Sequence, residues 1–264
     1  YERYSWQGVG LTLILDLFLF GAIGAAVWAV QMLWIPVTAA GIVNGIGHWW
    51  GYRSFETADA SRNFMPWGVL IGGEELHNNH HTYPTSAKLS VKPYEFDIGW
   101  AYIRILEALR LASVHRVAPR LRLGSAQATP DGKTLEAIST HRHEVMARYA
   151  RRVRSAAGVE LRRMRVDRAD ANRVAAMKLA RRWLHRDAER IPVGAKRQIA
   201  QALVISPHLA QLVRMRESLR HLWTGTNVSA EQLVEELRVW LQEAENSGLA
   251  TLQEFAGRLR LLEA

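Results

Sequence analysis

The chain has 264 residues, 48% of them hydrophobic, and a formal net charge of +9, which is enough sequence for one large domain or two modest ones. It contains no cysteine, so a disulfide scaffold, a thiol nucleophile, a thiolate zinc site and a cysteine-ligated iron–sulfur cluster are all excluded. Any bound metal must therefore be held by histidine, carboxylate or amide groups.

The charge is distributed unevenly along the chain. Residues 1–114 contain seven basic and nine acidic residues, whereas residues 115–264 contain 27 basic and 16 acidic residues. We therefore expect an apolar membrane part at 1–114, a linker at 115–133 and a basic helical accessory domain at 134–264. The chain begins at Tyr1 with no basic leader or cleavage signal, so we expect its true start to lie upstream.

The longest uncharged stretch predicts membrane helices. No Asp, Glu, Lys or Arg occurs in residues 17–52. One straight helix of this length would measure about 54 Å, well beyond the hydrocarbon thickness of about 30 Å. The stretch therefore predicts a membrane helical hairpin with spans at about 8–32 and 36–50 and a turn at about 28–34, where tryptophans favour the interface. Asp16 is expected to face protein or the membrane edge. The alternative is the buried helical core of a soluble protein.

Four of the ten histidines cluster where the second span ends. The sequence EELHNNHH at 74–81 places three histidines on one face of a helical turn, where neutral imidazoles can converge on a cation. His48 stands at the end of the second span, with Asn44 one turn before it. Imidazole ligands suit iron, zinc, copper or nickel, and Glu74 and Glu75 are placed to orient them by accepting a ring N–H. The alternative is a solvated or capping histidine cluster.

These motifs resemble a known family. NGIGHWWGYR at 44–53 and GGEELHNNHHTYPTSAKLSVKPYEFDIGW at 72–100 resemble the C-terminal half of an integral-membrane fatty acid desaturase of the stearoyl-CoA (delta-9) type, especially the bacterial acyl-CoA and acyl-lipid desaturases. The resemblance covers about residues 5–115. It implies a di-iron oxidoreductase that uses oxygen and two electrons to remove two hydrogens from adjacent methylenes of an acyl chain.

The resemblance also implies ligands and partners. Carried over by position, it makes His48, His77, His80 and His81 ligands of two non-haem iron ions, and Asn44 a contact through water. It implies a fatty acyl substrate carried on CoA or lipid, an electron donor of the ferredoxin or cytochrome b5 type with its reductase, and a place in the bacterial inner membrane with the histidine box and the C-terminal domain cytoplasmic.

One departure from the family affects the expected activity. The family has two further histidine boxes before this region, whereas the first histidine of this chain is His48. We therefore expect an incomplete di-iron site and no activity from this chain alone. The alternative enzyme is a related His-box hydroxylase, since the same oxidant can rebound oxygen onto the acyl chain.

Two helices are expected beside the histidine box. Residues 61–76 predict a short helix with Pro66 in its first turn. Residues 97–111 carry apolar side chains at positions 98, 102, 105, 106 and 109, which form a helical stripe. The expected role of this stripe is packing under the metal site, and the alternative is docking an electron donor or lining the acyl tunnel.

The C-terminal region predicts a small helical bundle. Residues 115–133 lack periodicity and contain two prolines and two glycines, which indicates a linker. Beyond it we expect five or six short helices, one capped by Asp167 and ending near Asp187, and two that begin with capping boxes at Ser229 and Thr251. The overall fold class is therefore all-α.

The net charge of +11 over residues 115–264 fits an anionic membrane surface, an acidic redox partner or nucleic acid. Residues 218–260 are weakly similar to the tails of some bacterial transposases. Because no nucleic-acid motif is present and the region is fused to membrane helices, we expect a membrane-side accessory role and no nucleic-acid partner. The alternative from another class is a non-enzymatic basic adaptor that binds lipid or nucleic acid. Five scattered histidines are expected to be ordinary surface or core residues: His141, His143, His185, His208 and His221.

Overall fold

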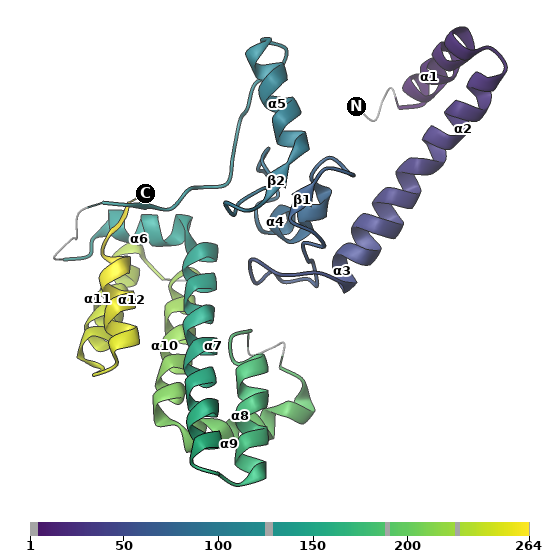
Figure 1. Cartoon of the computed structure of the whole chain (residues 1–264). Coiled ribbons are helices and arrows are strands. Elements are labelled where there is room, and N and C mark those ends of the chain that lie inside the picture. The colour runs from purple at the N-terminus through teal and green to yellow at the C-terminus, as the bar shows by residue number, and fades with distance from the viewer. Residues whose placement is uncertain (1–4, 125–128, 188–190, 225–227, 264) are drawn as a thin grey trace. The chain divides into compact units, whose positions relative to one another are not determined.

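The computed structural model describes residues 5–124, 129–187, 191–224 and 228–263. The chain divides into two compact units, residues 1–118 and 119–264, each considered separately below. Most of the described residues are helical, and only four two-residue strands accompany the helices, which confirms the predicted all-α class (Figure 1).

A helical hairpin opens the first unit. Helix α1 (Ser5–Phe20) folds back along helix α2 (Ile23–Pro36), and the indole nitrogen of Trp28 donates a hydrogen bond of 3.1 Å to the carbonyl of Val9 (Figure 1). The turn lies at Gly21, whose φ of +62° is a left-handed conformation that glycine adopts without strain. The helical hairpin is present as predicted, but the predicted turn at 28–34 and the predicted bounds of the two spans are wrong.

The two helices of the hairpin approach closely near Asp16. A Cβ atom at Gly24 would lie 2.1 Å from the Asp16 carbonyl oxygen, so only glycine allows this contact. The Asp16 side chain is buried, with 7% of its surface exposed. It faces protein, which is one of the two placements expected from the sequence.

Helix α2 continues past Pro36 instead of beginning there. Proline lacks a backbone N–H, and the helix widens directly after it into a π-helical segment, η2 (Val37–Ile46), which leads into the short helix α3 (Gly47–Trp49). Together these segments form one apolar helix of 27 residues, Ile23–Trp49, with a mean hydropathy of 1.7. Among the described residues, it is the helix long and apolar enough to cross a membrane. Only 12% of its most apolar window is buried, unlike the core helix of a soluble protein.

Short elements surround the histidine box. Strands β1 (Trp67–Gly68) and β2 (Phe96–Asp97) pair in parallel, and a 3₁₀ turn, η3 (Glu74–Leu76), runs into helix α4 (His77–Thr82). The helix predicted at 61–76 is wrong, because Pro66 and the positive φ angles of Gly72 and Gly73 interrupt helical geometry there.

Helix α5 (Ile98–Ala108) confirms the helix predicted at 97–111, and the Asp97 side chain caps it by accepting the backbone N–H of Trp100. The expected packing of its apolar stripe under the metal site is wrong. The stripe side chains Tyr102, Ile105, Leu106 and Leu109 have between 41% and 62% of their surface exposed.

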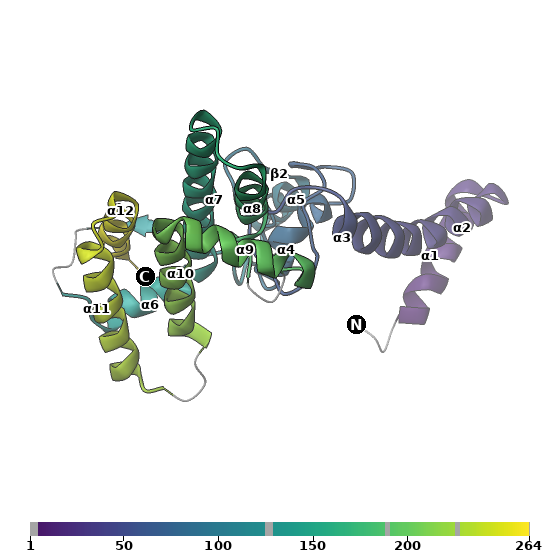
Figure 2. The same cartoon turned by 90° about the horizontal axis from the view of Figure 1, so that it is seen from below.

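The second unit is a helical bundle. Its helices are α6 (Gly132–Thr140), α7 (Arg142–Val166), α8 (Ala171–Trp183), α9 (Val193–Ile205), α10 (Pro207–Thr224), α11 (Ala230–Asn246) and α12 (Ala250–Leu259). Helix α7 packs against α8 and α10, and α9 lies next to α8 and α10 (Figure 2). Strands β3 (Arg122–Leu123) and β4 (Leu262–Glu263) pair antiparallel and hold the two ends of the unit together.

The predicted helix caps in this unit are correct in part. The capping box at Ser229 is present, but Asp170 rather than Asp167 caps α8, and Thr251 lies inside α12 instead of capping it. The described residues of this unit form seven helices, more than the five or six expected, and α9 and α10 are separated by Ser206 alone.

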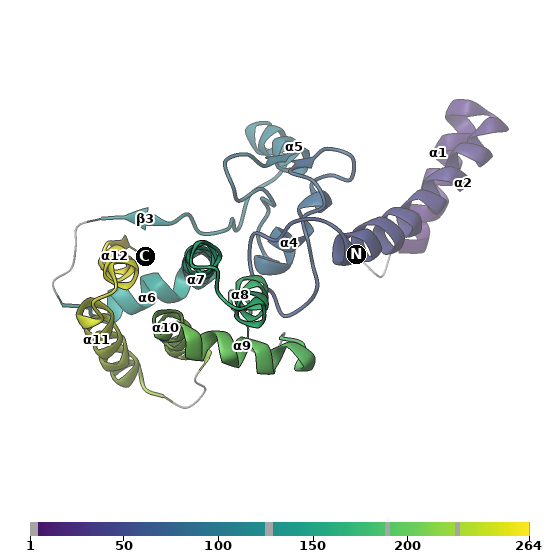
Figure 3. The ribbon, with the colours of Figure 1, turned by 60° about the horizontal axis from the view of Figure 1, so that its bottom comes forward.

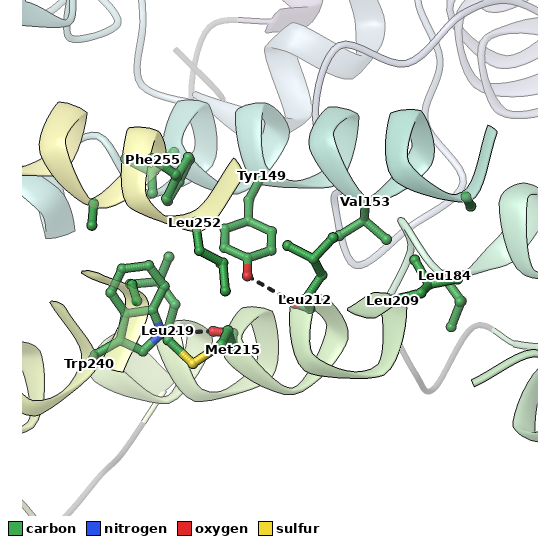
Figure 4. Close-up of a cluster of buried hydrophobic side chains, with 14 of the residues drawn as sticks. Tyr149, Val153, Leu184, Leu209, Leu212, Met215, Leu219, Trp240, Leu252 and Phe255 are labelled. Carbon is green, nitrogen blue, oxygen red and sulfur yellow. Dashed lines mark hydrogen bonds between the residues drawn. The ribbon is translucent and has the colours of Figure 1, made fainter. Parts of the chain in front are cut away.

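The core of the bundle is built around three aromatic rings. The rings of Tyr149 and Phe255 meet edge to face with centroids 4.8 Å apart, and Trp240 packs against both (Figure 4). The Tyr149 hydroxyl donates to the carbonyl of Leu212 at 2.9 Å, and the Trp240 indole donates to the carbonyl of Met215 at 2.8 Å. These bonds attach α7 and α11 to α10.

Candidate metal centre

Three histidines converge at the end of the long apolar helix. The helix ends one residue after His48, while helix α4 begins at His77 and carries His81 four residues later on the same face. One ring nitrogen from each of these histidines lies within 4.8 Å of the other two. The Nε2 atoms of His48 and His77 are 3.0 Å apart.

This arrangement fits a metal ion. Two imidazole nitrogens each about 2.1 Å from one ion, the distance typical of zinc, lie about 3.0 Å apart when the angle at the ion is close to a right angle. The donors are all nitrogen, which suits iron and the other first-row transition metals. The Nδ1 atom of His77 is buried without a hydrogen-bond partner, and the nearest Glu74 oxygen is 3.6 Å away.

The structure separates His80 and Asn44 from this cluster. The His80 ring stands beside His81 with centroids 5.6 Å apart, but His80 is not part of the convergent group. The Asn44 amide is exposed and donates to the carbonyl of Ala39 at 2.8 Å. The roles predicted for these two residues as an iron ligand and a water-mediated contact stay predictions.

Glycine at position 47 allows the His77 ring to approach the helix. A Cβ atom there would lie 3.1 Å from Cδ2 of the His77 ring, closer than side chains normally pack. The residue thus provides the space in which the rings of His48 and His77 meet.

Two carboxylates lie beside the imidazoles. The Nδ1 atom of His81 forms a very short contact with Oδ2 of Asp59, and Glu74 lies beside Nδ1 of His77. Carboxylates in these positions fix the tautomer and orientation of a ligating imidazole. Burial alone would raise the pKa of Asp59, but hydrogen bonds from Ser61, Thr57 and His81 hold that pKa well below its usual range.

Glu74 is ionised for a related reason. The neighbouring imidazole of His77 lowers the pKa of Glu74, and this effect outweighs the opposing effect of burial. The sequence predicts that Glu74 orients an imidazole, but it gives no comparable signal for Asp59. Asp59 lies 22 residues from His81 in a loop, so no helical spacing connects the two, and only the polar run Thr57-Ala58-Asp59-Ala60-Ser61 marks it.

Glu75 does not orient an imidazole, and that prediction is wrong. Its side chain is fully buried and accepts the backbone N–H groups of Leu70, Ile71 and Gly73. It therefore holds the glycine-rich turn before the box in a fixed conformation.

The two asparagines of the HNNHH box point to the opposite side of α4. Asn78 accepts the backbone N–H groups of Ser54 and Phe55 at 2.8 and 2.9 Å and donates to the carbonyl of Phe55. Asn79 donates to the buried carboxylate of Glu95 at 2.7 Å. These bonds attach the histidine helix to the loop that follows His48 and to the loop before α5.

Glu95 connects several segments of this scaffold. One carboxylate oxygen accepts the backbone N–H groups of Val91 and Lys92, and the other accepts the hydroxyl of Tyr52 at 2.9 Å. Burial, together with this nearby carboxylate, raises the pKa of Tyr52, so the phenol stays protonated and keeps donating. The geometry of the histidine cluster therefore depends on a buried polar network.

The first unit combines a long apolar helix with a nitrogen-donor site at its end, which makes it a candidate metal-binding unit. Part of the chain is similar to named desaturases. Over 70 residues it is 44% identical to an sn-2 palmitoyl-lipid 9-desaturase of Nostoc sp. (strain 36), which is 26% of this chain and 25% of that protein. Over 117 residues it is 33% identical to a probable chloroplastic lipid desaturase of Arabidopsis thaliana, 43% of this chain and 32% of that protein.

A third relative extends the similarity to acyl-CoA enzymes. The chain is 35% identical over 99 residues to an acyl-CoA 5-desaturase of Anemone leveillei, which is 37% of this chain and 30% of that protein. The chain spans a quarter to a third of the length of these relatives. Part of the chain is thus similar to proteins named as acyl-lipid and acyl-CoA desaturases. No solved structure matches the chain.

The second unit matches a different family. The transposase family of the ISL3 DDE type matches residues 132–263, which is half of the chain. The chain therefore belongs to this transposase family through its C-terminal half. The weak similarity of residues 218–260 to transposase tails was the one sequence signal that pointed to it.

Proposed function

We propose that the first unit forms part of the non-haem iron centre of a fatty acyl desaturase. The observation that carries this proposal is the convergence of His48, His77 and His81 beside two ionised carboxylates. His80 is the fourth proposed ligand, and Asn44 is the proposed contact through water. Two iron ions, when bound, would supply the oxygen chemistry that removes two hydrogens from an acyl chain.

The residues of this chain prepare the site. Asp59 is placed to accept the Nδ1 proton of His81, which selects the tautomer whose Nε2 lone pair is available to a metal. Glu74 is placed to do the same for His77. The exposed apolar surface of Ile23–Trp49 is proposed to lie in the bilayer, which would bring an acyl chain to the site from the lipid phase.

The finer features of the proposal follow the family resemblance. We propose that α1 and the long helix are both embedded in the bacterial inner membrane, with the histidine cluster on the cytoplasmic side, and that a ferredoxin or cytochrome b5 type donor with its reductase supplies electrons. The four proposed histidine ligands are fewer than the ligand set that the family resemblance implies, so we propose that this chain yields no product alone.

Metal analysis tests this proposal. The detergent-purified chain is loaded with ferrous iron under argon, and bound iron is measured per chain for the unchanged protein and for His77→Ala. We expect the variant to lose most of the bound iron. The matched control is His208→Ala, an exposed histidine of the second unit, and equal iron in both variants would refute the site.

Complementation tests the activity. The chain is expressed alone and together with the segment of a relative that carries the other two histidine boxes. The masses of the acyl products are then measured by mass spectrometry. Loss of two hydrogens only in the combined form would support the proposal. Gain of one oxygen would indicate the hydroxylase, and product from the chain alone would contradict the incomplete site.

A second candidate function concerns the second unit. Its membership of a transposase family and the basic surface of α7 favour nucleic acid as a partner, against the expectation from sequence. Six arginines of that helix are exposed: Arg142, Arg151, Arg154, Arg162, Arg163 and Arg165. Such a surface would neutralise phosphates and release counterions.

Salt dependence separates this candidate from a membrane role. The full chain in neutral-lipid nanodiscs is titrated with duplex DNA and, separately, with vesicles containing anionic lipid at several salt concentrations. Tight DNA binding that weakens steeply with salt, with no preference for anionic vesicles, would establish the nucleic-acid role. The reverse preference would establish the membrane role.

A further inference from the structure

A cavity in the second unit is independent of the metal centre. Its volume is about 430 Å³, within the range of about 300–1,000 Å³ that is typical of small-molecule sites. Helices α7 and α12 and strands β3 and β4 surround it, and Figure 3 shows β3, α7 and α12 in this part of the unit. Six apolar side chains line its wall: Leu121, Leu123, Val145, Phe255, Leu259 and Leu262.

The remaining lining is polar and almost entirely basic. Arg148, Arg151 and Arg152 of α7 project toward the cavity together because residues three and four apart share a helix face. Arg258 of α12 adds a fourth guanidinium, and Ser155 adds a hydroxyl.

Two carboxylates neutralise only part of this charge. Glu144 accepts a hydrogen bond from Arg148 at 3.0 Å and lies 3.7 Å from Arg151. Glu254 pairs with Arg152 at 3.2 Å and with Arg258 at 2.9 Å. Among the side chains that the structure describes here, four guanidinium groups pair with these two carboxylates, which leaves an excess of two positive charges.

We propose that this cavity binds a small anionic amphiphile, a molecule with an apolar body and a carboxylate or phosphate head group. The leucine, valine and phenylalanine wall would hold the body, because moving apolar surface out of water is favourable. The planar guanidinium groups would hold the head, since their paired N–H donors match carboxylate and phosphate oxygens.

The lining argues against other anions. A free phosphate ion would gain nothing from six apolar side chains. A DNA backbone would be too large to enter a cavity of about 430 Å³ and would instead contact exposed arginines of α7 that do not line it, such as Arg162 and Arg165. Because apolar and basic side chains line the same cavity, it favours a ligand with an apolar body and an anionic head group.

Calorimetry on the full chain in neutral-lipid nanodiscs tests the proposal, with empty nanodiscs as the blank. The probes are octanoate, octyl phosphate, 1-octanol and inorganic phosphate. We expect one of the two charged eight-carbon probes to bind with a stoichiometry of one, and the octanol and phosphate probes to bind about tenfold more weakly or not at all. Whichever of octanoate and octyl phosphate binds more tightly identifies the head group as a carboxylate or a phosphate.

Variants locate the binding site. Arg151→Gln removes one guanidinium, 59% exposed, that no core contact requires, and we expect affinity to fall about tenfold. Arg163→Gln is the matched control because Arg163 lies on the same helix, is 76% exposed and does not line the cavity. Ser155→Trp should block the cavity, with an unchanged unfolding temperature showing that the bundle is intact.

Three outcomes would overturn the proposal. Inorganic phosphate binding as tightly as octyl phosphate would indicate a simple anion site. An equal loss of affinity in the Arg163 control would indicate a diffuse effect of charge. No saturable binding of either charged probe would show that the cavity does not bind this class of ligand. The four arginines would then serve only the ion pairs with Glu144 and Glu254.

Discussion

The imidazole of His81 and the carboxylate of Asp59 are hydrogen-bonded across 22 residues of sequence, Nδ1 to Oδ2. The bond joins helix α4 to the loop that follows the long apolar helix, and it fixes which nitrogen of His81 points toward His48 and His77. Further hydrogen bonds from Thr57 and from the backbone of Ser61 hold the Asp59 carboxylate in place.

Replacing Asp59 should weaken metal binding. Asp59→Asn removes the charge that orients His81, and the loss of such a supporting carboxylate lowers metal affinity about 10–100-fold. Competition with a coloured ferrous chelator measures the affinity. The control is Glu107→Gln on the exposed helix α5, which pairs with Arg104 far from the histidines in sequence. An unchanged affinity in D59N would mean that the proposed orienting role is wrong.

A methyl group at position 47 should disturb the same site from the other side. Gly47→Ala would place a Cβ atom 3.1 Å from the His77 ring and displace the ring from His48. We expect iron affinity to fall while the helix content measured by circular dichroism is retained. Gly41→Ala is the matched control, because a Cβ atom there meets nothing within 4 Å. Equal iron binding in both variants would contradict the close approach.

Loss of the Asn78 amide should destabilise the first unit. Asn78→Ala leaves the backbone N–H groups of Ser54 and Phe55 without their acceptor, and each unsatisfied buried donor costs about 1–3 kcal/mol. Urea unfolding followed by tryptophan fluorescence reports mainly on this unit, because seven of the ten tryptophans lie before residue 115. Asn172→Ala on the exposed start of α8 serves as the control, with a change of less than about 0.5 kcal/mol expected.

The second unit should lose stability in mild acid. Burial, with smaller contributions from the charges of Arg154 and Arg186, lowers the pKa of His185 from 6.5 to about 4. Between pH 6.5 and 4 the unfolded chain takes up a proton that the folded chain refuses, so stability falls as the pH is lowered. Well above pH 6.5, His185 is neutral in both the folded and the unfolded chain, so it adds no pH dependence to the free energy of unfolding.

Thermal unfolding between pH 7 and pH 4 measures this effect. His185→Gln should flatten the decline relative to the unchanged chain, whereas His208→Gln, an exposed histidine, should leave it as it was. An undiminished slope in H185Q would assign the acid sensitivity to other groups, of which His143 is one, since burial and the charge of Arg142 lower its pKa to about 4.

The amino-acid sequence was sufficient to predict how residues within one helix are placed relative to one another. His77 and His81 share a face because they are four residues apart, and the apolar stripe at 97–111 and the capping box at Ser229 follow from the same periodicity. The position of the hairpin turn could not be predicted from helical periodicity. Apolar side chains run through the turn without a change of composition, and the left-handed conformation of Gly21 decides where the chain reverses.

The sequence by itself determined the helical class, the division between a neutral apolar part and a basic part, and the histidine types that suit a transition metal. Only the tertiary structure decided that Asp59 supports the site, that Glu75 and the two asparagines serve the scaffold, and that four arginines of α7 and α12 line one cavity. The physical reason is the range of the interactions. Helical periodicity acts over three or four residues and is written in the local sequence, whereas buried hydrogen bonds and cavities join segments whose proximity exists only after the chain has folded.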